Sequence, residues 1–123
     1  PLYPGTGMER ETGAGNIYHA TIPPMGGSAE FRKVWKDRLL PAIDAHAPDL
    51  LIISAGFDAH TRDPLANLDV RDEDFAWITE QLCDLADKHC GGRVVSTLEG
   101  GYDLSGLATG AAAHVQVLAE RCG

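Results

Sequence analysis

Two short segments typical of buried strands, joined by one amphipathic stretch, limit the folds that this chain can adopt. They are LLIISA at 50–55, a continuous apolar run, and RVVSTL at 93–98. Between them, apolar residues recur every three or four positions from Asp72, which predicts a helix ending at Gly91-Gly92. A strand, a helix and a strand in this order predict a βαβ unit with parallel strands. Continuous apolar runs further predict strands that are covered on both faces.

The remaining sequence extends this alternation of strands and helices. IYHATI at 17–22 is rich in β-branched and aromatic residues and predicts another strand. Ser28 is expected to cap a helix that Pro41 kinks or splits, because proline lacks the donor for the preceding turn. A last helix is expected over 104–121. The positions expected to be buried are Phe31, Val34, Trp35, Leu39 and Ile43 in the first helix, Phe75, Ile78, Leu82, Leu85 and Ala86 in the second, and Leu107, Ala111, Val115 and Leu118 in the last.

The predicted fold class is α/β, with part of a doubly wound, mainly parallel sheet. Residues 17–123 are expected to form a βαβαβα segment, and the glycine-rich stretch 1–16 a loop without regular structure. Three strands make a sheet with open edges, and their apolar runs need cover on both faces. The sequence therefore predicts the C-terminal half of a larger domain, whose other half precedes residue 1.

Charge and composition exclude several classes of function. Eighteen acidic and ten basic side chains give a formal net charge of −8, which disfavours binding to nucleic acid. No apolar run approaches the roughly 20 residues that cross a bilayer. Cys83, Cys90 and Cys122 match no zinc-finger spacing and are expected to be free thiols in a reducing compartment. These features predict a cytoplasmic protein that binds no membrane.

Two segments that follow the predicted strands carry reactive side chains. Ligands of open α/β sheets bind beyond the carboxyl ends of the strands, where SAGFDAHTRDPLANLDV at 54–70 begins. In this segment Asp58, His60 and Asp63 are either metal-ligand candidates or loop residues that accept hydrogen bonds from backbone amides.

The second segment is LEGGYDL at 98–104. Gly100 and Gly101 predict a turn with access to positive φ, which would present Tyr102 at the end of a strand. A phenol is a neutral hydrogen-bond donor at pH 7 and could stabilise a developing oxyanion. The alternative is a tyrosine that packs on the last helix.

Three ordered motifs, PLYPGTG, SAGFDAHTRDPLANL and LEGGYDLSGLA, resemble the C-terminal half of histone deacetylase-like amidohydrolases. The resemblance is strongest to the class II-like and bacterial branch, which includes acetylpolyamine amidohydrolases and acetoin-utilisation proteins. It covers essentially the whole chain. It implies an arginase/deacetylase-like sheet, with 1–123 as the C-terminal part of a single catalytic domain and 1–16 as an active-site loop.

The resemblance also implies roles for particular residues. Asp63 matches a zinc-ligating aspartate of the family, and Tyr102 matches the catalytic tyrosine. Tyr18 matches a position that supplies a backbone carbonyl to a structural monovalent cation such as K⁺. His60 has no ligand role in the family. The positions that would line the substrate tunnel are Tyr3, Gly100 and Gly101.

The family's paired histidines and its Asp-x-His zinc motif have no counterpart in this sequence. Zinc generally takes three protein ligands, so the chain alone is expected to be inactive and to need the other half of its domain as a partner. The activity implied for the intact enzyme is zinc-dependent hydrolysis of N-acetyl amides, either acetyl-lysine or acetylpolyamine; a homo-oligomer is compatible with the sequence. The alternatives are a non-catalytic truncated product or interaction module and, less favoured, an arginase-type ureohydrolase.

Overall fold

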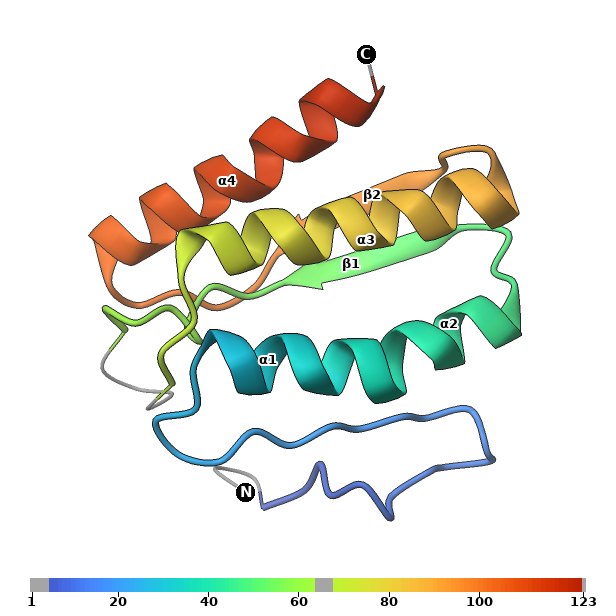
Figure 1. The fold of residues 1–123 in the computed structure, drawn as a ribbon, viewed down its shortest axis with the longest axis horizontal. Coiled ribbons are helices and arrows are strands. Elements are labelled where there is room, and N and C mark those ends of the chain that lie inside the picture. The colour runs from blue at the N-terminus through green and yellow to red at the C-terminus, as the bar shows by residue number, and fades with distance from the viewer. Residues whose placement is uncertain (1–4, 64–67, 123) are drawn as a thin grey trace.

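The computed structural model describes residues 5–63 and 68–122. Its elements follow one another as helices and strands in the order that the sequence predicts from residue 28 onward (Figure 1). They are α1 (Ser28–Val34), a π-helical turn η1 (Trp35–Leu39), α2 (Leu40–His46), β1 (Leu51–Ala55), α3 (Asp72–Cys90), β2 (Val94–Leu98) and α4 (Leu104–Cys122). Among the described helices, none has the length and apolar character needed to cross a membrane.

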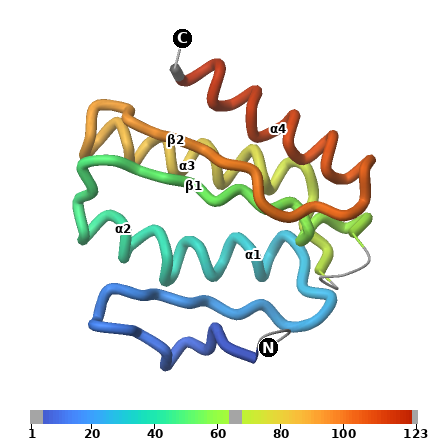
Figure 2. Tube along the Cα trace, turned by 180° about the vertical axis from the view of Figure 1, so that it is seen from behind, coloured from blue at the N-terminus to red at the C-terminus, as the bar shows by residue number. Residues whose placement is uncertain are grey.

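The two strands form a parallel pair, which confirms the predicted α/β class and the βαβ unit. The register runs from Leu51 opposite Val94 to Ala55 opposite Leu98. Helix α3 connects the strands and lies over one face of the pair (Figure 1). Figure 2 shows the pair from behind, with the strands in front of α3.

The opposite face of the sheet is open in this chain, so the prediction of strands buried on both faces is wrong for it. Ile52 in β1 is 64 % exposed, and Val95, its partner in β2, is also exposed. Side chains alternate between the two faces of a strand, and the described helices cover only the face toward which Ile53 and Ala55 point. Apolar runs that suit a two-sided sheet are therefore covered here on one side.

The predicted strand at 17–22 is also wrong. The segment has no regular structure and runs beside α1 and α2 instead of joining the sheet (Figure 1). The side chain of Arg38 holds it there by donating from Nε to the carbonyl of His19 at 2.6 Å. A strand requires a neighbour with which to pair its backbone, and the described residues offer this segment none.

The first helix is split, as the proline predicts. Pro41 lies at the start of α2, directly after the π-helical turn η1, where the backbone pattern widens. The helix ends at His46, and Ala47 takes a left-handed φ of 53° before Pro48. The cap differs from the prediction: Gly27 is the N-cap, and Ser28 points to α3 because its hydroxyl donates to Asp74 at 2.5 Å.

A single apolar core lies between β1, α1 and α3. Phe75 stands at its centre, with its ring centroid 5.1 Å from that of Phe57 and 6.4 Å from that of Phe31. The predicted buried face of α3 is confirmed except for Leu85, which is half-buried. The buried core residues are Phe31, Ala55, Phe57, Val70, Phe75, Ile78 and Leu82.

The buried face of α4 is offset from the prediction. The buried residues of α4 are Gly106, Gly110, His114 and Val117, whereas Val115 is exposed and Leu107, Ala111 and Leu118 are half-buried. The glycines explain the offset, since a Cβ at Gly110 would lie 3.0 Å from the Phe57 ring. The helix approaches along its small residues, and Leu107 and Ala111 pack against the core while they remain partly exposed.

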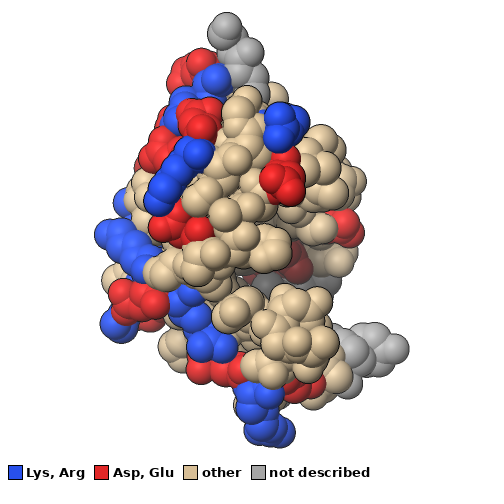
Figure 3. Space-filling model, turned by 90° about the vertical axis from the view of Figure 1, so that its right-hand side faces the viewer, with Lys and Arg blue, Asp and Glu red and all other residues tan. Residues whose placement is uncertain are grey.

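Charged side chains pair across the helix surfaces rather than forming one acidic patch. Arg121 of α4 donates to Glu80 at 2.6 Å and to Asp87 at 2.7 Å, both on α3, and these acids raise the pKa of the Arg121 guanidinium. On the face drawn in Figure 3, side chains of both signs interleave along one margin and the rest is mostly uncharged. Acidic and basic side chains thus lie next to one another on this face.

Candidate active site

The carboxyl ends of β1 and β2 meet at one edge of the sheet. The amide of Glu99 donates to the carbonyl of Ala55 at 2.9 Å, and the amide of Phe57 donates to Gly100 at 2.8 Å. These bonds continue the strand pairing for one step beyond the sheet. The segment that carries Asp63 and the segment that carries Tyr102 are therefore held side by side.

Asp63 lies under the backbone of the tyrosine segment. Asp63 is only 6 % exposed, and its Oδ2 accepts hydrogen bonds from the amides of Tyr102 at 2.7 Å and Asp103 at 3.1 Å. Of the two roles that the sequence allows for Asp63, the acceptance of hydrogen bonds from backbone amides is thus observed. Two amide donors favour an ionised carboxylate and fix its orientation.

Tyr102 is presented outward by the two glycines before it. The residue is 60 % exposed, so the alternative that its ring packs on α4 is wrong. Gly101 has a φ of 147°, and a Cβ there would lie 2.9 Å from Leu107. A Cβ at Gly100 would lie 3.1 Å from the carboxyl carbon of Asp58. Glycine is therefore required for both the backbone conformation and the close packing of this turn.

Helix α4 starts directly after this turn and is capped by its own sequence. Asp103 is the residue before the helix, and its Oδ2 accepts the amide of Gly106 at 2.7 Å. This is the N-cap geometry that satisfies a free amide in the first turn. The cap fixes the direction in which the chain leaves Tyr102.

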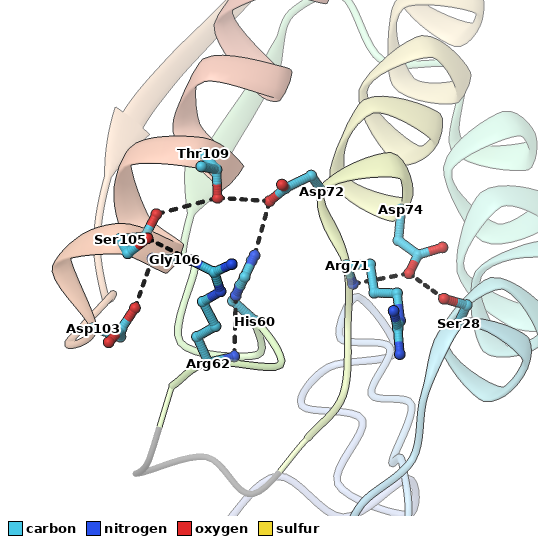
Figure 4. Close-up of polar contacts among 10 residues, drawn as sticks. All are labelled: Ser28, His60, Arg62, Arg71, Asp72, Asp74, Asp103, Ser105, Gly106 and Thr109. Carbon is cyan, nitrogen blue, oxygen red and sulfur yellow. Dashed lines mark hydrogen bonds and ion pairs between the residues drawn. The ribbon is translucent and has the colours of Figure 1, made fainter.

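A buried histidine supports the loop that carries Asp63. His60 Nε2 lies 2.8 Å from Asp72 Oδ1, and the hydroxyl of Thr109 donates to the same oxygen at 2.9 Å (Figure 4). The sequence grouped His60 with Asp58 and Asp63 as metal-ligand candidates. Its ring instead faces Asp72 and the start of α4. No pattern in the sequence indicated Asp72 or Thr109 as its partners, because they follow 12 and 49 positions later.

The other predicted site residues lie elsewhere. Tyr3 is outside the described residues. Tyr18 is described and exposed, and it borders a cavity of about 690 Å³ with Trp35, His46 and Leu50. Leu50 precedes β1, so Tyr18 is near the amino end of that strand, whereas Asp63 and Tyr102 follow the carboxyl ends.

The described part of the chain does not contain a full metal site. No group of three or more histidine, cysteine, aspartate or glutamate residues within it could hold a metal ion. Cys83 and Cys90 are buried, and His89 contacts Asp44 at 2.7 Å. Among the carboxylates at the edge where α/β proteins bind ligands, Asp63 is buried and is held by two backbone amides.

The parallel strands and their covering helices define an α/β protein, in which Asp63 and Tyr102 follow the carboxyl ends of the strands. Residues 1–118 match the family model described as histone deacetylase domain. This chain belongs to the histone deacetylase family.

Similar proteins extend well beyond this chain. Type-2 histone deacetylase 2 of Dictyostelium discoideum is 38 % identical over 110 residues, which are 84 % of this chain and 6 % of that protein. A probable deacetylase of Archaeoglobus fulgidus is 38 % identical over 110 residues, or 86 % of this chain and 31 % of that protein. The crystal structure of the HDA15 HD domain superposes with a TM-score of 0.88 at 36 % identity, covering 97 % of this chain and 34 % of that one. The chain therefore spans about a third or less of these relatives.

Proposed function

We propose that this chain supplies part of the active site of a zinc-dependent deacetylase that hydrolyses N-acetyl amides of the acetyl-lysine or acetylpolyamine type. Membership of the histone deacetylase family and the deacetylase names of its relatives support the reaction class. The observation that carries the proposal is the 2.7 Å hydrogen bond from the Tyr102 amide to Asp63 Oδ2. It holds the Asp63 carboxylate against the backbone of the residue that carries the phenol.

Asp63 is proposed as a metal ligand. Its carboxylate is buried, and the amides of Tyr102 and Asp103 hold one oxygen in place. Such outer hydrogen bonds commonly orient carboxylates that bind metals. Bound zinc would supply Lewis-acid activation of the acetyl carbonyl and a water whose pKa is lowered to about 7. The remaining ligands and the groups that move protons would come from polypeptide outside this sequence.

Tyr102 is proposed as the donor to the oxyanion that forms when water attacks the acetyl carbonyl. Its phenol is accessible, and its backbone is fixed on both sides, by Gly101 before it and by the Asp103 cap after it. A preorganised donor of this kind typically contributes roughly 3 kcal/mol to transition-state stability. Tyr3 and the glycine pair remain predicted walls of a substrate tunnel, and the Tyr18 carbonyl remains a predicted ligand of a structural cation such as K⁺.

The partner that completes the site is proposed to be the remaining part of a histone deacetylase domain. The chain aligns with 34 % of the HDA15 HD domain, so about two thirds of such a domain lies outside it. The open face of the sheet, with Ile52 and Val95 exposed, is the kind of surface that another layer of a domain covers. On its own, the chain is therefore proposed to be inactive.

The test compares residues 1–123 alone with the longer polypeptide in which they occur, on an acetyl-lysine peptide and on an acetylated polyamine. The proposal expects acetate release only from the longer polypeptide. Acetate release by residues 1–123 alone would refute the proposal that the remaining metal ligands lie outside this sequence. No release from either, together with urea formation from guanidino substrates, would favour an arginase-type ureohydrolase. No hydrolysis of any of these substrates would favour a non-catalytic module.

A further inference from the structure

His60 is a buried histidine to which the proposed chemistry assigns no step. It is 3 % exposed, and its ring lies parallel to that of Phe75 with centroids 6.2 Å apart. The amide of Arg62 donates to Nδ1 at 3.1 Å. Since a backbone amide can only donate, Nδ1 carries the lone pair and Nε2 carries the proton that it donates to Asp72 at 2.8 Å.

This imidazole joins three segments of the chain (Figure 4). Asp72 is the first residue of α3, and its Oδ1 also accepts the hydroxyl of Thr109 from α4 at 2.9 Å. Beside it, Arg62 Nη1 donates to the hydroxyl of Ser105 in the first turn of α4 at 2.6 Å. The loop that follows β1 is thereby bound to the starts of both long helices.

The first turn of α4 rests directly on the imidazole. A Cβ at Gly106 would lie 2.8 Å from Nδ1 of His60 and 3.1 Å from its Cγ. No side chain fits in this space, and a ring locked by two hydrogen bonds and a stacked neighbour cannot yield easily. Gly106 therefore lets α4 approach His60 at a distance that other residues would prevent.

These contacts fix the loop that carries Asp63 and the helix start that follows Tyr102. The amide of Asp63 donates to the carbonyl of His60 at 2.8 Å, which closes the loop around the histidine. The amides of Tyr102 and Asp103 donate to the Asp63 carboxylate, and these two residues immediately precede the first turn of α4, which rests on the His60 ring. A shift of the ring would separate the carboxylate from the amides.

We infer that His60 is a positioning residue that holds the Asp63 carboxylate against the amides of Tyr102 and Asp103, and so sets the catalytic phenol relative to the metal ligand. The catalytic meaning of this placement rests on the proposed deacetylase function. The placement itself requires only the contacts of His60 with Asp72 and Arg62.

The test uses hydrogen exchange of the Tyr102 and Asp103 amides in the full-length protein, because this readout needs neither zinc nor substrate. His60→Leu removes both ring hydrogen bonds, and it is expected to accelerate exchange at these amides about tenfold, equivalent to ~1.4 kcal/mol. His114→Leu is the matched control, since His114 is also buried and is hydrogen-bonded through both ring nitrogens. The control is expected to leave exchange at Tyr102 and Asp103 unchanged at a comparable loss of global stability.

Two milder variants cover the case in which His60→Leu fails to fold. Thr109→Val removes an exposed hydroxyl from the network, and Gly106→Ala forces the first turn of α4 away from the ring. Both are expected to accelerate exchange in the same direction and by less than His60→Leu, about threefold, because each leaves the two ring hydrogen bonds in place. His60→Gln restores a donor toward Asp72 and is expected to recover part of the protection.

Zinc dissociation measured with a chelator provides the second readout. It is expected to be faster in His60→Leu and Gly106→Ala than in His114→Leu. Unchanged amide exchange in the His60 variants, or equal acceleration in His114→Leu, would overturn the positioning role even where hydrolysis persists. A wild-type protein that neither binds zinc nor releases acetate would overturn the deacetylase function instead, irrespective of the exchange result.

Discussion

The carboxylate of Asp74 is the polar contact through which α1 and α3 hold together, and its replacement by asparagine should cost about 2–3 kcal/mol of unfolding free energy. Asp74 is 1 % exposed and accepts hydrogen bonds from the hydroxyl of Ser28 at 2.5 Å, Arg32 Nε at 2.8 Å and the Arg71 amide at 3.0 Å. In Asp74→Asn, one oxygen can still accept from two of these donors. The amide nitrogen then faces the guanidinium of Arg32.

The magnitude follows from what each partner loses. A hydrogen bond to a charged group contributes about 1.5–3 kcal/mol, and a neutral one about 1 kcal/mol. The side chain of Arg32 is 35 % exposed, so solvent screening places its share at the lower end. The weakened hydrogen bonds to Ser28 and Arg71 supply the rest of the expected loss in unfolding free energy.

The effect should depend on pH with a defined sign. Burial by itself raises the pKa of Asp74, but the hydrogen bonds from Ser28, Arg71 and Arg32 outweigh it, and the pKa lies below its ordinary value. A lowered pKa in the folded state gives a stabilisation that is present above the unfolded value of about 3.9 and is lost as the pH falls below it. The difference between wild type and Asp74→Asn should therefore shrink from pH 7 to pH 3.

Denaturant unfolding followed by circular dichroism at both pH values measures this difference. Asp37→Asn is the matched control, because its ion pair with Lys33 is exposed and screened by solvent. A loss in Asp74→Asn at pH 7 no larger than in this control, or a difference that grows in acid, would refute the reasoning.

Two further substitutions test particular features. Burial lowers the pKa of His114 from its ordinary value of 6.5. The neutral form therefore stabilises the fold above about pH 6.5, and this contribution is lost as the pH falls through the lowered pKa. His114→Gln should flatten the pH dependence of the melting temperature between pH 7 and 5, and an unchanged slope would contradict this. Gly101→Ala should cost about 1–3 kcal/mol because alanine rarely adopts a φ of 147°. Gly27→Ala, at a φ of −112° with ordinary contact distances, is the control in the same unfolding assay; equal losses would argue against strain at Gly101.

Local patterns were sufficient to predict most of the regular elements. Alternation of short apolar runs with amphipathic stretches predicts β1, α3, β2 and α4 to within a residue or two, because helix caps and strand ends depend on nearby residues. Pro41 likewise predicts the interruption of the first helix. The segment 17–22 failed because strand formation depends on a pairing partner that local composition does not encode.

The site was predictable in its position and only partly in its contacts. Two loops that follow parallel strands must lie at one edge, so proximity of Asp63 and Tyr102 follows from topology. The close contact of Gly106 with His60 depends on how α4 packs against the loop after β1. For the same reason the buried stripe of α4 was misplaced: its hydrophobic periodicity marks Val115, whereas the close approach allowed by Gly106 and Gly110 decides which face is inward.

Bound zinc and acetate release measured in the same preparations of the full-length protein test the proposed site most directly. Asp63→Ala should lose both the metal and hydrolysis, because it removes the proposed metal ligand. Tyr102→Phe should retain about one zinc per chain and lose turnover by roughly 100-fold or more, as expected for a missing oxyanion donor. Wild-type turnover in Tyr102→Phe, or unchanged zinc in Asp63→Ala, would contradict the assignment of these two residues to one deacetylase site.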